Sequence, residues 1–409
     1  MWLYNLGISL YAGGIRLAAL WHGKARLWSE GRRNIFERME AAVRPSDRIV
    51  WVHAASLGEF EQARPIIERL RAEHPEYKIL LTFFSPSGYE IRKNYEGADY
   101  VFYLPADTPS NARRFLDIVH PEIAIFIKYE FWINLLSELR RRKVRSYIVS
   151  AIFRRNSVFF RPYGAMWRQA LETFDTLFVQ NVESKRLLSE IGFDNVVVAG
   201  DTRFDRVAQI AAAAQRVEMI ERFRGGGRLF VAGSTWGPDE EILLPLVNAN
   251  PDVKFVIAPH EMDEGRIAHL MRDAKGGAVR YTQCDAATRF DDVQVLVLDT
   301  MGMLSSVYGS ATWAYVGGGF GVGIHNTLEA ATFGLPIAFG PNYGKFKEAR
   351  DMVSLGCAVS VRTAGELAAW FAPLRDDEET LRRASRTAKD YTARNQGATG
   401  IILRSIFNS

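Results

Sequence analysis

From residue 48 onward, short apolar runs alternate with longer stretches of helical periodicity. Seven runs rich in β-branched and aromatic residues come first, at 48–53, 78–83, 99–104, 122–128, 145–150, 175–179 and 195–199. They lack apolar–polar alternation, which is typical of strands buried on both faces of a parallel sheet. Helical stretches lie between them, for example 60–73, 109–117 and 131–142. This β–α–β pattern predicts a doubly wound sheet.

A second series of strand-like runs follows, at 228–232, 253–258, 278–281, 293–298, 312–316, 335–339 and 357–361. A charged helical stretch over 203–224 and three glycines, Gly225–Gly227, separate the two series and indicate a hinge. A length of 409 residues also fits two domains better than one. We therefore predict an α/β protein with Rossmann-like domains over 23–205 and 206–375, followed by a charged C-terminal helix over 376–409.

Two successive Rossmann-like domains are the architecture of GT-B glycosyltransferases. In open parallel sheets, ligands bind beyond the carboxyl ends of the strands. Two such domains facing each other would bring both sets of strand ends to a central cleft. Topology alone does not name a function, so the loops after the strands have to supply it.

The N-terminal segment is the most apolar part of the chain. Its first 21 residues carry one charge, Arg16, and a basic stretch over 24–38 follows. About 20 apolar residues can span a bilayer, so we predict that residues 1–22 form a membrane-anchor or interfacial helix. The basic residues would keep the rest of the chain on the cytoplasmic side. The alternative is an amphipathic helix that docks on the protein's own core.

Composition excludes several classes of protein. A net charge of +4 is mild, and we expect no nucleic-acid partner. Cys284 and Cys357 allow neither a disulfide framework nor a zinc motif, which fits a reducing cytoplasm. The chain contains no D-x-D triplet, so we expect no metal site of that type.

Two glutamates follow strand ends in the first domain. Glu59 lies three residues after Ser56, so it is either the last residue of a capping box or a general base at the edge of the cleft. A helix N-terminus favours its ionised form. Glu130 stands directly after a strand and before Phe131-Trp132, where its pKa could be perturbed; the alternative is an ordinary helix-start acid.

Arg203 follows the last strand of the first domain, where it could neutralise a departing phosphate. The alternative is a salt bridge of the linker with Asp201 or Asp205.

The second domain contains the sharpest local pattern. Five of the seven residues in Gly317–Gly323 are glycine, and a helix begins near Asn326. Glycines permit close backbone approach, and a helix start attracts phosphate. Glu329 could accept the hydroxyls of a ribose or close a capping box with Asn326. The run lacks the last glycine of G-x-G-x-x-G, which argues against a dinucleotide dehydrogenase.

Taken together, the segments "HAASLGE", "GSTWGPDEE", "DTMG", "GGGFGVGIHNTLEAA" and "GLPIAFGP" resemble the 3-deoxy-D-manno-octulosonic acid (Kdo) transferase family in order and spacing. The resemblance implies an inverting GT-B enzyme at the cytoplasmic face of the cell inner membrane. Its donor would be CMP-Kdo and its acceptor a lipid A precursor, lipid IVA, in lipopolysaccharide biosynthesis. No cofactor or metal is implied.

The resemblance also assigns roles to residues. Glu59 matches the family's catalytic base, and Glu130 and Arg203 match groups thought to stabilise the transition state. Donor contacts would come from Pro259, His260, Met301, Gly302, Met303, Asn326, Thr327, Leu328 and Glu329.

This chain departs from the family pattern at five of its positions. His260 stands where the family usually has arginine, Met303 near a usual glutamate, and Ala330 in place of proline. Lys128 replaces the first acid of an E-x-E segment, and Arg203 replaces a lysine, which keeps the charge and changes the geometry.

Two other hypotheses remain open. One is a different GT-B glycosyltransferase that uses a UDP-sugar on a membrane-embedded acceptor. The other is a membrane-associated nucleotide-sugar binder without catalytic activity.

Overall fold

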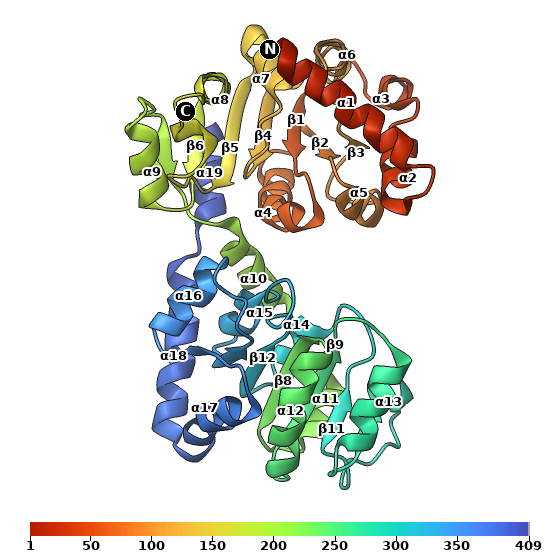
Figure 1. The fold of residues 1–409 in the computed structure, drawn as a ribbon, viewed down its shortest axis with the longest axis vertical. Helices are drawn as coiled ribbons and strands as arrows, with labels where there is room; N and C mark the ends of the chain where they lie inside the picture. The colour runs from red at the N-terminus through yellow and green to blue at the C-terminus, as the bar shows by residue number, and fades with distance from the viewer. Residues whose placement is uncertain (408–409) are drawn as a thin grey trace. The chain divides into compact units, whose positions relative to one another are not determined.

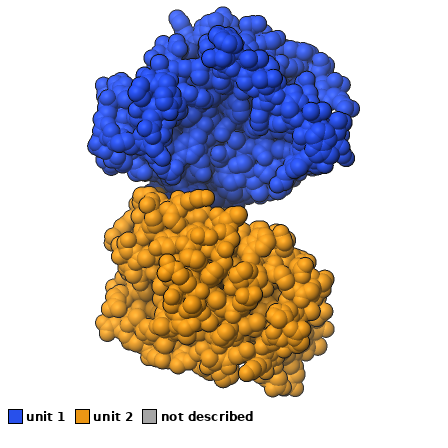
Figure 2. All heavy atoms as spheres, viewed as in Figure 1, with its two compact units in different colours: residues 1–206, 396–409 blue, residues 207–395 orange. Residues whose placement is uncertain are grey.

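The computed structural model describes residues 1–407 and divides into two compact units, coloured separately in Figure 2. Unit 1 comprises Met1–Arg206 together with the C-terminal residues from Gln396 onward, and unit 2 comprises Val207–Asn395. The division falls inside helix α10 (Thr202–Ala213). The triple glycine at 225–227 therefore lies within unit 2, just before its first strand, and the hinge expected there is wrong.

Unit 1 is built around one parallel sheet in the strand order β3-β2-β1-β4-β5-β6-β7 (Figure 1). Its strands are β1 (Ile49–His53), β2 (Lys78–Phe83), β3 (Tyr100–Tyr103), β4 (Ile123–Ile127), β5 (Arg145–Ala151), β6 (Thr176–Val179) and β7 (Val196–Val198). Its helices are α1 (Trp2–Ala18), α2 (Gly23–Glu30), α3 (Ile35–Ala42), α4 (Leu57–Glu73), α5 (Pro86–Arg92), α6 (Pro109–Val119), α7 (Ile133–Arg142), the 3₁₀ turn η1 (Val158–Phe160), α8 (Ala165–Leu171), α9 (Val182–Ser189) and α19 (Ala398–Phe407).

Unit 2 repeats this arrangement with the strand order β10-β11-β9-β8-β12-β13-β14. Its strands are β8 (Leu229–Thr235), β9 (Lys254–Pro259), β10 (Ala278–Arg280), β11 (Val295–Val297), β12 (Trp313–Val316), β13 (Ile337–Phe339) and β14 (Ala358–Ser360). Its helices are α11 (Glu218–Arg224), α12 (Gly237–Ala249), α13 (Glu264–Asp273), the 3₁₀ turn η2 (Tyr281–Gln283), α14 (Leu304–Tyr308), α15 (Thr327–Thr332), α16 (Lys347–Ser354), α17 (Ala364–Asp376) and α18 (Glu378–Arg394).

Every strand predicted from the apolar runs is present, and all neighbouring strands in both sheets are parallel. The reason is visible in β1, where all five residues are buried. Trp51 packs into the layer that contains α3, α6 and α7, whereas Val50 and Val52 pack into the layer that contains α4 and α19. A strand covered on both faces has no polar side, so its sequence does not alternate.

The charged C-terminal helix expected over 376–409 is two helices with different partners. Helix α18 packs on unit 2 through Ala384 and Ala388, and it ends before Asn395–Gly397. Helix α19 instead inserts Ile402, Leu403 and Ile406 into the core of unit 1, beside α4. Gly397 has a φ of +104°, a conformation that glycine adopts readily, and it breaks the helix there.

Helix α1 has no buried residue, but polar side chains attach it to unit 1. The Tyr4 hydroxyl donates to Asp107 at 2.6 Å and accepts from the backbone N–H of Ile133, and Asn134 donates to Asn5 at 2.9 Å. Large apolar residues of α1 and the turn after it remain exposed, among them Trp2, Leu10, Leu20 and Trp21. Among residues 1–407, no helix combines the length and apolar character needed to cross a bilayer.

The packing of α19 on unit 1 predicts how shortening one of its buried side chains changes stability. Ile402→Ala should lower the free energy of unfolding of unit 1 by about 2–5 kcal/mol, because it leaves a cavity in a packed core. Arg404→Ala, on the exposed side of the same helix, should change it by less than about 0.5 kcal/mol. Urea unfolding followed by circular dichroism measures both; equal effects would mean that α19 is not packed as described.

Candidate active site

In unit 1, the two candidate glutamates meet at the point where the strand order reverses. The chain runs outward from β1 through β2 to β3 and then returns to β4 on the other side of β1. Glu59 lies in the first turn of the helix after β1, and Glu130 lies in the loop after β4. Because β1 and β4 are adjacent and parallel, both loops leave the same edge of the sheet. Such a reversal opens a crevice in doubly wound sheets.

Backbone strain redirects the chain just before Glu130. Lys128, the first residue after β4, has a φ of +62°, in the left-handed region that non-glycine residues rarely adopt. Ser150 in β5 and Ser234 in β8 are in the same region, with φ values of +54° and +55°. All three lie at carboxyl ends of strands, and strain of this kind is concentrated at functional sites.

Glu130 is held by two side chains. Its Oε2 accepts a hydrogen bond from Trp132 Nε1 at 2.8 Å and lies 3.2 Å from His53 Nε2. His53 is the last residue of β1 and is fully buried, and its Nδ1 lies 2.8 Å from Thr82 Oγ1. The acid predicted as a possible helix-start residue is therefore anchored to the neighbouring strands through a histidine.

A chain of buried hydrogen bonds connects this acid to the neighbouring strands. Trp51 Nε1 can only donate, and it donates to Thr82 Oγ1 at 2.8 Å. His53 Nδ1 lies close to two oxygens of Thr82, the hydroxyl at 2.8 Å and the carbonyl at 3.1 Å. Trp132 Nε1 donates to Glu130 and also lies 3.2 Å from His53 Nε2. Trp132 and His53 therefore hold the Glu130 carboxyl group in one position.

Glu59 is the N3 residue of α4 and closes a capping box with Ser56, as the sequence predicted. Its Oε2 accepts from the Ser56 backbone N–H at 2.9 Å and from the Ser56 hydroxyl at 3.1 Å. Burial raises the pKa of Glu59, and the charge of Glu130 raises it further, whereas Lys128, Ser56 and His53 act in the opposite direction. The net shift is opposite to what the helix N-terminus alone would give. A capping role and a general-base role are compatible, because only one oxygen is used by the cap.

Arg203 makes the ion pair that the sequence offered as its alternative role. Its guanidinium binds Asp201 at 2.8 Å, and its backbone N–H donates to the same carboxylate at 2.9 Å. Asp201 is buried and also accepts from Gln62. Burial alone would raise the pKa of Asp201, but Arg203 outweighs it and holds that pKa below its ordinary value.

These groups act on one another within unit 1. Burial raises the pKa of Tyr129, the residue before Glu130, while the charges of Arg154 and Arg203 lower it and that of Asp201 raises it. Arg203 is thus electrically linked to the loop that carries Glu130. Glu59, Glu130 and Arg203 all belong to unit 1, as the sequence analysis expected.

Unit 2 has its own reversal of strand order, between β8 and β12. The glycine run follows β12 and packs tightly against neighbouring backbone. A Cβ on Gly317 would lie 2.2 Å from the carbonyl oxygen of Ser234, and one on Gly319 would lie 2.6 Å from the Cα of Gly340. Close approach to the protein's own backbone therefore requires these two glycines.

A buried carboxylate joins the two loops at this reversal. Asp239, on α12, accepts from the backbone N–H groups of Gly318 and Trp236, each at 2.9 Å, and from the Tyr315 hydroxyl at 2.8 Å. Burial raises the pKa of Asp239, and these donors oppose that shift. Asp239 thereby fixes the start of the glycine run relative to the loop after β8.

Three aromatic rings line the same edge of unit 2. The ring of His260, directly after β9, lies 4.8 Å from that of Trp236 and 4.3 Å from that of His325. Trp236 Nε1 also donates to His325 Nε2 at 3.2 Å. Burial lowers the pKa of His325, and the charge of His260 lowers it further. Stacked rings of this kind can pack against a flat heterocycle.

The remaining residues predicted for the donor lie on the starts of α14 and α15. Glu329 accepts from the Ser305 hydroxyl at 2.8 Å and from Asn326 Nδ2 at 3.0 Å, so α14 and α15 are joined at their first turns. Asn326 caps α15 by accepting from the N–H of Leu328. Thr327 and Leu328 are buried in this structure.

The other predicted donor residues differ in exposure. Met301 is 77% exposed, Gly302 has a φ of +85°, and Met303 is the N-cap of α14. Pro259 closes β9 and is buried. Within residues 1–407, no cluster of three His, Cys, Asp or Glu side chains could hold a metal ion.

Sequence reasoning missed four residues that organise these sites: His53, Trp132, Asp239 and His325. His53 and Asp239 stand inside segments that the resemblance had already singled out, but their contacts lie across the sheet. Trp132 to His53 and Asp239 to Gly318 are separated by 79 residues each. A single sequence carries no signal for such pairs.

Comparison with solved structures identifies the architecture. The chain is similar to UDP-GlcNAc 2-epimerase from Neisseria meningitidis bound to UDP-GlcNAc (TM-score 0.63, 15% identity, 88% of this chain and 100% of that one). It is also similar to MurG from Acinetobacter baumannii (TM-score 0.55, 13% identity, 89% of this chain and 100% of that one). These likenesses and the two parallel sheets define a protein of the GT-B fold, as predicted.

Sequence comparison finds relatives along most of the chain. Residues 32–206 match the model of the family described as 3-deoxy-D-manno-octulosonic-acid transferase (kdotransferase). The 3-deoxy-D-manno-octulosonic acid transferase of Bordetella pertussis is 28% identical over 87% of this chain and 86% of its own length, and that of Haemophilus influenzae is 25% identical over 88% and 86%. Over most of its length, the chain is therefore similar to Kdo transferases.

The coupling of Glu59 to its charged neighbours predicts a pH dependence for the expected role of Glu59 as a general base. In that role Glu59 would have to be ionised, so its raised pKa would move the acid limb of the kcat/KM profile to higher pH. Glu130→Gln removes a repulsive charge and should move that limb to lower pH. Lys128→Met removes an attractive charge and should move it to higher pH. Profiles normalised to their maxima test the pair; shifts in the same direction would contradict the coupling.

Proposed function

We propose that this chain is an inverting glycosyltransferase that moves Kdo from CMP-Kdo to a lipid A precursor, lipid IVA, with Glu59 as the general base. The observation that carries the proposal is the pair of carboxylates at the reversal point of unit 1. Glu130 is held in place by His53 and Trp132, and burial together with the charge of Glu130 raises the pKa of Glu59. A carboxylate whose pKa is raised toward neutral pH is better matched to accepting a proton from a hydroxyl group.

In this mechanism, Glu59 of unit 1 is the base that takes up the proton. The acceptor's hydroxyl oxygen attacks the anomeric carbon of Kdo, the bond from that carbon to the phosphate oxygen of CMP breaks, and Glu59 takes the hydroxyl proton. The anomeric carbon becomes electron-poor during the exchange, and the fixed negative charge of Glu130 would stabilise that state. Arg203, which retains exposed surface while bound to Asp201, would oppose the charge on the departing phosphate.

Unit 2 would bind the nucleotide. The rings of Trp236, His260 and His325 offer a flat apolar surface for a base, and the first turns of α14 and α15 offer backbone N–H groups. Glu329, already joined to Ser305 and Asn326, would accept ribose hydroxyls through its remaining lone pairs. His260 and Met303, where the family pattern is altered, make this surface less charged than arginine and glutamate would. The cleft expected between the units stays a prediction.

The location follows from the N-terminal helix. Helix α1 is attached to unit 1 by Tyr4 and Asn5, while Trp2, Leu10 and Trp21 stay exposed. Exposed apolar side chains on a helix followed by basic residues suit the interface of an anionic bilayer. We therefore propose that the protein acts at the cytoplasmic face of the cell inner membrane, with α1 lying in the interface.

The function is tested by transfer and nucleotide protection together. With CMP-Kdo and lipid IVA, the protein should form a product heavier by one or more Kdo units. Glu59→Gln should lower kcat by about 10²–10⁴-fold, because it removes the general base. CMP should raise the melting temperature of wild type and variant equally, since the proposed nucleotide surface lies in unit 2.

Two results would contradict the proposal. Near-wild-type transfer by Glu59→Gln would remove Glu59 from the chemistry. Protection by UDP but not CMP, with no Kdo transfer, would favour a GT-B enzyme that uses a UDP-sugar, and protection by CMP without any turnover would favour a binding protein.

A further inference from the structure

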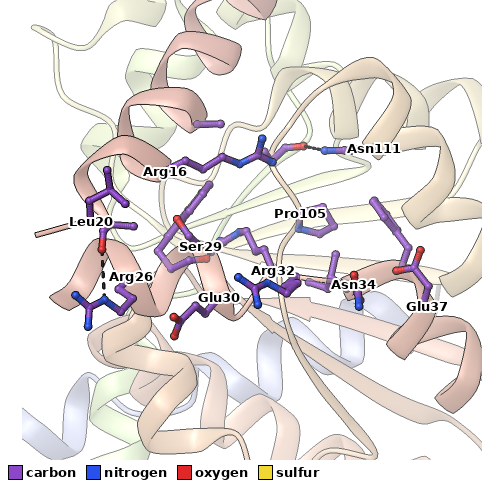
Figure 3. Close-up of a pocket in the computed structure, with 17 residues that line it drawn as sticks. Arg16, Leu20, Arg26, Ser29, Glu30, Arg32, Asn34, Glu37, Pro105 and Asn111 are labelled. Atoms are coloured by element: carbon purple, nitrogen blue, oxygen red, sulfur yellow. Dashed lines mark hydrogen bonds between the residues drawn. The ribbon is translucent and has the colours of Figure 1, made fainter. Parts of the chain in front are cut away.

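A pocket of about 750 Å³ lies in unit 1 between α1, the segment from α2 to α3, and the loop after β3 (Figure 3). Four arginines line it: Arg16 from α1 and Arg26, Arg32 and Arg33 from the α2–α3 segment. In Figure 3, Arg16 extends from α1 toward Asn111 on the opposite wall. The first 31 residues, which contribute much of the lining, precede the match to the family model.

The arginines differ in what they already bind. Arg32 donates to the carbonyl oxygens of Leu104, Phe84 and Trp28, so it is part of the wall. The side chains of Arg16 and Arg33 make no hydrogen bond or ion pair with any residue in the described range, 1–407. Both are exposed. These two guanidiniums are therefore available to a ligand.

Acidic residues reduce the positive charge of the pocket without cancelling it. Glu30 and Glu37 also line it, and Glu37 is paired with Arg114 at 3.2 Å. Counting the lining side chains alone, four cationic groups face two anionic ones. An arginine fork binds phosphate with two parallel hydrogen bonds, so two unpaired forks favour a phosphate-class anion.

The rim of the pocket on the α1 side is apolar. Leu20 lines the pocket and is 71% exposed, and Trp21 beside it is 70% exposed. The helix is fixed to the rest of unit 1 through Tyr4 and Asp107, so this surface has a defined place next to the arginines. Apolar surface beside a cationic pocket matches an amphiphile with an anionic head group.

The pocket lies at the same sheet edge as the carboxylates. Its wall residue Arg32 binds the carbonyl groups of Phe84 and Leu104, which follow β2 and β3. The Phe84 ring lies 4.6 Å from that of Trp132, and Trp132 donates to Glu130. A path of contacts through Phe84 and Trp132 thus links Arg32 in the pocket wall to Glu130.

We propose that this pocket binds a phosphate group of the glycolipid acceptor through Arg16 and Arg33, with the acyl chains against the exposed face of α1. A sugar anchored there extends toward Glu130 and Glu59 along the edge of the sheet. The inference rests on the proposed function, because it treats the ligand as the acceptor of that reaction. It adds the residues that select a phosphorylated acceptor.

The test measures binding without donor, so that it does not depend on turnover. Lipid IVA in detergent micelles is compared with the same lipid after enzymatic removal of its phosphates. Wild type should bind the phosphorylated form at least about tenfold more tightly, which is roughly the effect of one charge-assisted contact. Arg16→Gln with Arg33→Gln should lose that preference and bind both forms equally. Arg33→Gln alone should show an intermediate loss.

A matched control removes a charge elsewhere. Arg161 is an exposed arginine of unit 1 outside the pocket, and Arg161→Gln should keep the full preference. An unchanged preference in the double variant would overturn the proposal. The proposal would also be overturned if the double variant lost binding to phosphatidylglycerol vesicles as strongly as it lost binding to lipid IVA. The pocket would then bind anionic bilayer lipids in general and not the acceptor in particular. If the protein bound lipid IVA in a phosphate-dependent way but transferred no Kdo, the proposed function would be wrong. The conclusion that the pocket binds a phosphorylated lipid would still hold.

Discussion

Parallel strand direction is the constraint on which the sites of this protein depend. When every strand runs the same way, every strand-to-helix loop leaves at one edge of the sheet, and residues distant in sequence are gathered there. Glu59 and Glu130 meet because β1 and β4 are neighbours, although 71 positions separate them in the chain. In unit 2, the loops after β8 and β12 meet for the same reason. The reversal of strand order decides which loops become neighbours.

The polar groups at these edges are buried and therefore must be paired. His53, Thr82 and Asp239 are fully buried, and each has hydrogen-bond partners from other elements. A buried polar group without a partner costs about 1–3 kcal/mol, so these networks specify one arrangement of the loops. The same burial perturbs the pKa values of Glu59 and Asp239. Burial of these polar groups therefore both fixes the loop conformation and shifts the pKa values of the carboxyl groups.

The N-terminal segment combines attachment and exposure. Hydrogen bonds through Tyr4 and Asn5 hold α1 in place, while apolar side chains such as Trp2, Leu6 and Leu10 stay exposed. Arg16 of the same helix lines a cationic pocket. The sequence left two hypotheses open for this segment: a helix at the membrane and a helix docked on the protein's own core. The hydrogen bonds of α1 to unit 1 agree with docking, whereas its exposed apolar residues remain available to a lipid surface. A helix held by its polar groups is well suited to present a membrane-facing side.

The sequence by itself determined the secondary-structure elements and the resemblance to Kdo transferases. All fourteen strands were predicted from apolar runs, because burial on both faces leaves a local and continuous pattern. The capping box of Ser56 and Glu59 was predicted for the same local reason. The sequence also placed Glu59, Glu130 and Arg203 after strand ends, and it offered the ion pair of Arg203 with Asp201 as an alternative that the structure contains.

Only the tertiary structure decided what these residues contact. The hydrogen bonds of Glu130 to His53, of Asp239 to Gly318, and the packing of α19 on unit 1 join segments far apart in the chain. The hinge expected at Gly225–Gly227 and the single C-terminal helix were wrong because glycine content and charge describe local flexibility, not which unit a segment packs against. Local sequence patterns reflect whether an element is buried. Contacts between distant segments depend on the spatial order of the strands in each sheet, and that order produces no periodic pattern in a single sequence.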